Sequence, residues 1–188
     1  MREHDLLKPA LGPTLAVLRA IGPDQLDLPT PCTDLTVRGL LDHLAEWAPI
    51  LAAAAGSPAA PAASLRLRDE PTELAEALTR LADAWSQPSA WAGTTTMGGG
   101  DPLPAAMVGG MALGEIVLHG WDLARATGRS PVWDAEVVAF LHREVERTAE
   151  LGRQVKAYGP EFPVPETAPA LDRALGLSGR DPNWTPAA

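Results

Sequence analysis

The chain has 188 residues, of which 46% are hydrophobic, and its formal net charge at pH 7 is −9. This length and composition exclude a disordered chain and are enough for one domain with a buried core. The negative charge and the lack of any cluster of Lys and Arg argue against nucleic acid and anionic membranes as partners. We therefore expect a small molecule as the partner.

The location of the protein is expected to be cytoplasmic. No uninterrupted apolar run reaches the ~18 residues of a membrane-spanning helix, and the acidic start of the chain is unlike a signal peptide. The single cysteine, Cys32, excludes an intrachain disulfide. No His or Lys adjoins Cys32 in sequence to lower its pKa, so we expect a small buried side chain rather than a nucleophile. The abundance of Arg over Lys, with many Ala and Pro residues, indicates a GC-rich genome such as that of an actinobacterium.

Apolar residues at helical spacing predict five helices along the chain. These cover residues 4–21, 34–55, 71–85, 103–127 and 134–157. Asp34 or Thr36 is expected to cap the second helix, Asp134 to cap the fifth, and Gly128 to follow the fourth. Between the helices, residues 56–64 form a low-complexity loop and residues 86–104 break the helical pattern. An irregular, proline-rich tail begins at about residue 159 and is expected to wrap over the bundle.

The fourth helix carries three titratable residues on one face. Glu115, His119 and Asp122 fall at i, i+4 and i+7, within an arc of about 60°. The other directions of this helix are mostly apolar, which predicts that the helix is buried. Buried groups of this kind must be paired, protonated or bound to a metal. Arg125, three residues after Asp122, is a candidate partner for Asp122 or for a ligand.

A third metal ligand would have to come from another helix. His43 lies at the edge of the apolar stripe of the second helix, whereas His142 lies among charged residues on a face expected to be solvated. From the residues alone, a core histidine bonded to a carbonyl is favoured for His43, and a structural ion pair without metal is favoured for Glu115 and His119. Two His and one Glu with an open fourth position would instead match catalytic zinc sites, with Asp122 behind the ligands or as an added ligand.

Four segments of the chain resemble a known family. They are Pro29-Thr-Pro-Cys-Thr33, Val37-Arg-Gly-Leu-Leu-Asp-His43, Glu115-Ile-Val-Leu-His-Gly-Trp-Asp-Leu-Ala-Arg-Ala-Thr-Gly128 and Leu171-Asp-Arg-Ala-Leu-Gly-Leu-Ser-Gly-Arg-Asp-Pro-Asn-Trp184. This pattern is similar to the N-terminal domain of mycothiol-dependent maleylpyruvate isomerase, within the DinB-like metal-binding superfamily. The resemblance runs from near residue 29 to the end of the chain.

The resemblance implies an all-α fold. The expected architecture is an up-down four-helix bundle with extra wrapping segments at both ends, forming a single domain over residues 1–188. At the matching motif positions, the resemblance implies a divalent metal held by His43, Glu115 and His119. Zinc is the metal expected first, with nickel or iron as alternatives. Because bundles of this superfamily often dimerise, a homodimer is also expected.

Three functions follow from the resemblance and the buried triad. The first is a metal-dependent transferase or isomerase that uses a low-molecular-weight thiol such as mycothiol, with Asp122 and Arg125 as candidate groups around the substrate. The second is a hydrolase acting through metal-bound water, with Asp122 or an acid bonded to that water as base. The third is a non-catalytic protein that binds a small molecule in the same bundle.

Overall fold

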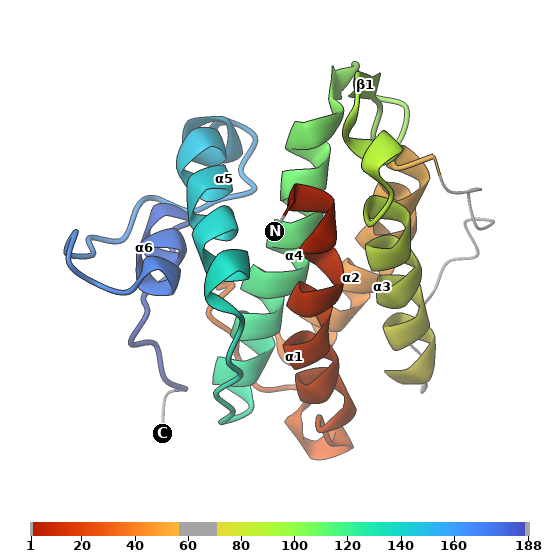
Figure 1. The fold of residues 1–188 in the computed structure, drawn as a ribbon. Coiled ribbons are helices and arrows are strands. Elements are labelled where there is room, and N and C mark those ends of the chain that lie inside the picture. Colours follow the sequence, from red (N-terminus) through yellow and green to blue (C-terminus); the bar gives the residue numbers. More distant parts are fainter. Residues whose placement is uncertain (1, 57–70, 187–188) are drawn as a thin grey trace.

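The computed structural model describes residues 2–56 and 71–186, and the described chain is mostly helical (Figure 1). Its elements, in chain order, are the short 3₁₀ turn η1 (Glu3–Asp5), α1 (Leu7–Arg19), η2 (Pro23–Gln25), α2 (Val37–Ala54), α3 (Pro71–Trp85), η3 (Pro88–Trp91), β1 (Thr94–Thr95), β2 (Leu103–Pro104), α4 (Ala105–Ala126), α5 (Ala135–Gln154) and α6 (Ala170–Leu177). The five predicted helices are thereby confirmed, and the sixth, α6, was not predicted.

Helices α1, α2, α3 and α4 enclose a common core, with α1 and α2 each packed against both α3 and α4 (Figure 1). Contacts near their ends give the direction of each helix. Lys8, at the start of α1, lies 2.9 Å from Asp83, at the end of α3, so these two helices are antiparallel. Trp85, which ends α3, donates its indole N–H over 2.9 Å to the Leu51 carbonyl near the end of α2. Helices α2 and α3 are therefore parallel.

The parallel pair differs from the expected up-down alternation of neighbouring helices. A short loop can join only antiparallel neighbours, and a crossover is needed to bring the chain back to the starting end. The link between α2 and α3 comprises residues 55–70, a number of residues that could reach further than the length of α2 if fully extended at about 3.3 Å per residue. The low-complexity segment predicted for residues 56–64 lies in this link, almost entirely outside the described residues.

Helix α4 lies at the centre of the fold. It contacts α1, α2, α3 and α5, and most of its residues are buried. Two glycines of α4, Gly109 and Gly110, let side chains of neighbouring elements approach the helix closely. A Cβ added to Gly109 would lie 2.8 Å from ring carbons of Trp91, and one added to Gly110 would overlap the Glu144 carboxylate. Gly114 differs, because a Cβ added there would meet no atom within 4 Å.

The segment after α4 adds a second layer outside the four helices. Helix α5 packs against α4, and α6 packs against α5 (Figure 1). The region from residue 159 was predicted to be irregular, but it contains the helix α6. The helix at Ala170–Leu177 is only eight residues long and follows several prolines, so its apolar period is too short to stand out in the sequence.

Several predicted helix ends are confirmed. The Thr36 hydroxyl accepts a hydrogen bond from the Gly39 N–H at 3.3 Å and so caps α2. Asp134 is the N-cap residue of α5, although its side chain makes no capping bond. Gly128 follows α4 with a φ of +72°, the left-handed conformation that glycine adopts most easily.

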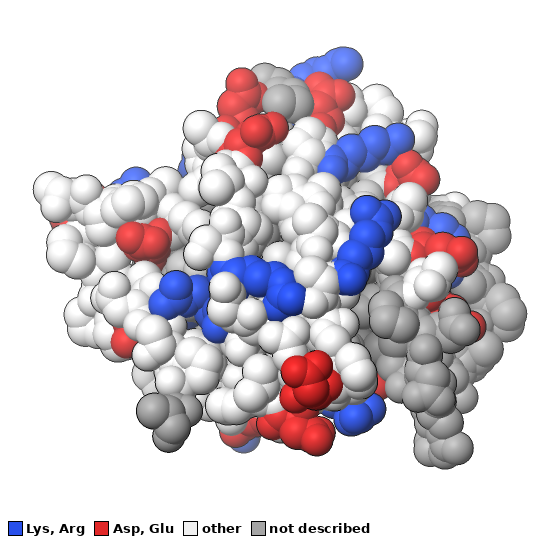
Figure 2. All heavy atoms as spheres, turned by 90° about the horizontal axis from the view of Figure 1, so that it is seen from below, with Lys and Arg blue, Asp and Glu red and all other residues white. Residues whose placement is uncertain are grey.

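The surface agrees with the dispersed charges of the sequence. On the face shown in Figure 2, Lys and Arg side chains lie among acidic and uncharged residues and form no continuous basic surface. Among the described helices, none is both long and apolar enough to cross a bilayer.

The contrast between Gly109 and Gly114 can be tested by two alanine substitutions. Gly114→Ala should raise the free energy of unfolding by up to about 1 kcal/mol, because alanine favours the helix and its methyl group enters open space. Gly109→Ala should lower it by about 1–3 kcal/mol, because Trp85 and Trp91 would have to move. Urea denaturation followed by circular dichroism measures both. Equal effects of the two substitutions would contradict the packing described for α4.

Candidate metal centre

Three side chains from two helices converge in the middle of the bundle. His43 comes from α2, and Glu115 and His119 come from α4, four residues apart on one face. Glu115 Oε2 lies 3.1 Å from His43 Nε2 and 3.4 Å from His119 Nε2. The rings of the two histidines meet edge to face, with centroids 4.9 Å apart. The structure thus brings together the three residues at which the resemblance places metal ligands.

The spacing of these donors suits a divalent metal ion. One ligand atom from each residue lies within 4.8 Å of the others. Two ligands about 2.05 Å from a tetrahedral zinc are roughly 3.3 Å apart, which agrees with the 3.1 and 3.4 Å separations. His43 and Glu115 retain 29% and 28% exposure of their side chains, so the cluster can be reached from outside. The donor set and its access therefore fit a metal with an open position.

The far side of His119 is held by a buried ion pair. Its Nδ1–H donates to Asp122 Oδ2 over 3.0 Å, and Asp122 is completely buried. Arg180, in the C-terminal segment, donates two hydrogen bonds to the same carboxylate, from Nε to Oδ1 at 2.9 Å and from Nη2 to Oδ2 at 2.8 Å. Since Nδ1 carries the proton, Nε2 is the nitrogen that faces Glu115 and could bind a metal. Asp122 thus lies behind the candidate ligand His119, which matches the first of its two predicted roles and not the second, that of an added ligand.

A second group of metal-type side chains overlaps the first. Ligand atoms of Cys32, His119 and Asp122 also lie within 4.8 Å of one another. However, the guanidinium of Arg180 already occupies both oxygens of Asp122 and lies 3.4 Å from His119 Nδ1. A cation at this point repels a metal ion. We therefore assign the metal-binding geometry to the group with His43 and Glu115.

The charges of the cluster shift the pKa values of its members. Burial alone would raise the pKa of Glu115, but the charge of His119 and the hydrogen bonds from both histidines hold it well below its usual range. Burial would lower the pKa of His119, but Glu115 and Asp122 together raise it to about 9. Burial would also raise the pKa of Asp122, and Arg180 and His119 outweigh that effect and lower it. Without a metal, the negative charges of Glu115 and Asp122 are therefore balanced by the positive charges of His119 and Arg180.

Cys32 and Arg125 lie beside the site in different ways. Burial and the neighbouring Asp122 charge raise the pKa of the Cys32 thiol, so the thiol stays protonated at neutral pH. The guanidinium of Arg125 bonds the main-chain carbonyl of Trp184, with Nε at 3.0 Å, and lies over the Trp121 ring. Arg125 is therefore an anchor for the C-terminal segment and makes no bond to Asp122.

Arg180 is the residue that sequence reasoning missed. On the same helix, Arg125 at i+3 was the expected partner of Asp122. A buried aspartate does demand a cation, but the sequence alone does not show which of the distant arginines supplies it. The only signal was that Arg180 stands within the Leu171–Trp184 segment, whose pattern carried part of the family resemblance.

The raised pKa of His119 predicts a pH dependence of stability. An unfolded histidine titrates near 6.5, so the buried imidazolium contributes stability below that pH, and the contribution is lost as the pH rises through 9. The free energy of unfolding of chelator-treated protein should therefore fall by roughly 1–3 kcal/mol between pH 6.5 and 9.5. His119→Gln should show a flatter profile over the same range. Identical slopes for the two proteins would contradict a protonated His119 between two carboxylates.

Comparison with known proteins places these observations in a family. The family model described as the mycothiol maleylpyruvate isomerase N-terminal domain matches residues 8–124. Two curated relatives, both called uncharacterized proteins, come from Mycobacterium tuberculosis: MT0763 from strain CDC 1551 / Oshkosh and Rv0738 from strain ATCC 25618 / H37Rv. Each is 28% identical over 184 residues, covering 96% of this chain and 97% of the relative.

A solved structure has the same fold. The crystal structure of the mycothiol-dependent maleylpyruvate isomerase matches with a TM-score of 0.54 and 19% identity, over 81% of this chain and 70% of that one. The family model spans more than half of the chain and includes all three candidate metal ligands. The chain therefore belongs to the mycothiol maleylpyruvate isomerase N-terminal domain family.

Proposed function

We propose that this protein binds one divalent metal ion through His43, Glu115 and His119 and uses it in a transferase or isomerase reaction that depends on a low-molecular-weight thiol. The observation that carries the proposal is the Glu115 carboxylate, which lies within 3.4 Å of the Nε2 atoms of both histidines. Zinc is the metal expected first. When bound there, a divalent ion would favour the thiolate form of a coordinated thiol at neutral pH.

The charge balance supports an anionic ligand at this centre. His119 must be neutral to bind a metal, while Asp122 and Arg180 keep their opposite charges. A divalent ion replacing one proton therefore leaves the cluster with one net positive charge. A thiolate would neutralise this charge in a largely buried environment, where an unbalanced charge is costly.

The site also explains why the thiol would come from outside the chain. Cys32 is the only cysteine, and the pKa of its thiol is raised by burial and by Asp122. A protonated thiol is a poor nucleophile. Cys32 therefore does not take the place of a small thiol such as mycothiol, the thiol that the name of the family suggests.

The hydrolase alternative loses its expected base. Asp122 was a candidate to deprotonate a metal-bound water, but it has no exposed surface and both of its oxygens accept hydrogen bonds from Arg180. Glu115 is itself a proposed ligand. Among the described residues of the cluster, no carboxylate is left to act on water, which favours the thiol reaction over hydrolysis.

The metal site is tested by comparing two histidine variants. The purified His43→Ala variant should contain much less metal than the purified wild-type protein, because the substitution removes one of three ligands. His142→Ala is the matched control, since His142 lies on α5 and belongs to neither group of possible metal ligands among the described residues. Plasma mass spectrometry of the proteins gives the metal content. Equal metal content in His43→Ala and wild type would contradict the site.

The reaction class is tested with the zinc-loaded protein and mycothiol. Consumption of a general electrophile such as 1-chloro-2,4-dinitrobenzene should be faster with protein than without it, and His119→Ala should abolish the acceleration. Turnover of p-nitrophenyl acetate that needs no thiol would favour the hydrolase instead. Metal binding with neither activity would contradict a thiol-dependent enzyme and leave the third function, a small-molecule binding protein.

A further inference from the structure

We propose that Arg180 is a positioning residue of the metal centre, which acts through Asp122 to hold the His119 imidazole with Nε2 directed toward the metal. This inference rests on the proposed function, because it concerns the same site. It adds a residue from the C-terminal segment to a centre whose three ligands come from α2 and α4. The family match ends at residue 124 and so assigns no role to Arg180.

The backbone after α6 is shaped to deliver Arg180. Gly179 has a φ of +86°, in the left-handed region that favours glycine. A Cβ at Gly179 would lie 2.7 Å from the Cα of Gly159, so the turn after α6 touches the turn after α5 backbone to backbone. The Arg180 N–H then bonds the Leu175 carbonyl at 2.8 Å, which closes the end of α6. This turn sends the Arg180 side chain back toward α4.

Arg180 orients Asp122, and Asp122 orients His119, through hydrogen bonds. Its guanidinium binds Asp122 with two parallel hydrogen bonds, an arrangement that sets the orientation of the carboxylate as well as its charge. The remaining Nη1 group donates to Ser178 Oγ at 3.1 Å. Asp122 in turn accepts the Nδ1–H of His119. With Nδ1 protonated and the ring held, the lone pair of Nε2 is left to face the metal.

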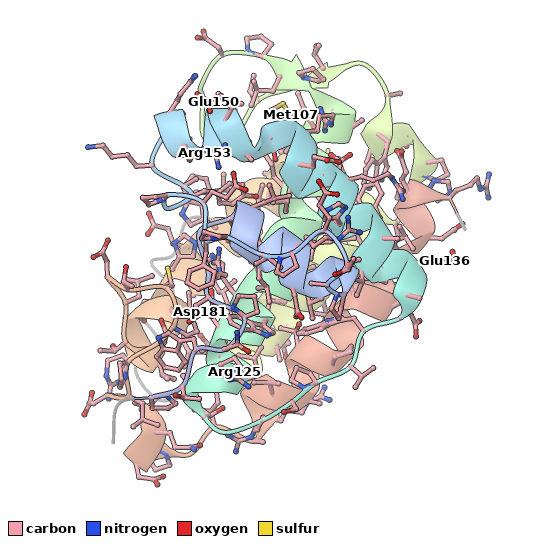
Figure 3. All side chains as sticks on the ribbon, turned by 90° about the vertical axis from the view of Figure 1, so that its left-hand side faces the viewer. Met107, Arg125, Glu136, Glu150, Arg153 and Asp181 are labelled. Carbon is pink, nitrogen blue, oxygen red and sulfur yellow. The ribbon has the colours of Figure 1, made fainter. Side chains whose placement is uncertain are left out.

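Two other arginines tie the same segment to the bundle without reaching the cluster. Arg125 on α4 bonds the carbonyl of Trp184, and Arg153 on α5 bonds the carbonyl of Leu177 at 3.3 Å. In Figure 3, Arg125 lies near Asp181 of the C-terminal segment, while Arg153 lies toward the other end of the view. These two residues are matched controls, because they anchor the segment on either side of Arg180. Within the described part of the chain, neither forms a hydrogen bond or ion pair with Asp122 or His119.

The experiment measures the affinity of the full chain for Zn²⁺ in competition with a chromophoric chelator. Arg180→Gln should weaken zinc binding by about 10- to 100-fold, the usual effect of removing a group that orients a metal ligand. Arg125→Gln and Arg153→Gln should bind zinc as the wild type does. The absorption spectrum of the Co²⁺-loaded protein should change in Arg180→Gln and stay the same in both controls.

A double-mutant cycle separates positioning from simple loss of structure. Asp122→Asn with Arg180→Gln leaves no unpaired buried charge, so this double variant carries the test if Arg180→Gln alone does not fold by circular dichroism. If Arg180 acts through Asp122, the double variant should bind zinc no more weakly than the weaker single variant.

Two results would overturn the inference about Arg180 and leave the proposed function standing. One is wild-type affinity and an unchanged Co²⁺ spectrum in every folded variant that lacks Arg180. The other is an equal loss of affinity in Arg125→Gln and Arg153→Gln, which would show that only the docking of the segment matters. Failure of the wild-type protein itself to bind zinc or cobalt would overturn the proposed function, and the inference with it.

Discussion

The structure depends on how four charged groups are balanced inside a helical core. Helix α4 places Glu115, His119 and Asp122 on one face of an otherwise apolar and mostly buried helix. Each of these groups would be costly there without a partner. His43 pairs with Glu115 at one end of this row, and Arg180 pairs with Asp122 at the other end. Two segments far apart in sequence must therefore meet at α4. The packing of α2 and of the C-terminal segment on α4 is therefore tied to this row.

The topology makes the meeting of these segments possible. Because α2 and α4 are antiparallel neighbours, the start of α2, which carries His43, lies beside the C-terminal half of α4. The long link at residues 55–70 allows α3 to run parallel to α2, which leaves α4 to close the core. Helix α5 then packs on α4 and α6 packs on α5 (Figure 1). Arg180, just after α6, reaches Asp122 on α4. The site is thus assembled from α2, α4 and the C-terminal segment.

Local physics was enough to predict the helices and the row on α4. The apolar spacing, the cap at Thr36 and the glycine at Gly128 are all short-range signals, and they were found where expected. The row at Glu115, His119 and Asp122 follows from the helical period alone. His43 was different, since the residues alone favoured a core histidine and only the family resemblance pointed to a ligand.

Features that depend on long-range contacts could not be read in the same way. The direction of α3 is defined by contacts with helices far away in sequence, such as Trp85 with Leu51, and no local pattern encodes it. The partner of Asp122 was sought at i+3, although a buried carboxylate can be satisfied by an arginine 58 residues away. The eight residues of α6 show too little periodicity to separate a helix from a proline-rich tail.

X-ray absorption spectroscopy of the zinc-loaded protein tests most directly whether His43, Glu115 and His119 form the metal site. A site formed by these three residues should give only nitrogen and oxygen neighbours at about 2.0–2.2 Å, with the outer-shell scattering typical of two imidazoles. A sulfur neighbour at about 2.3 Å would show that Cys32 binds the metal in place of one of these three ligands. That result would contradict the site described here.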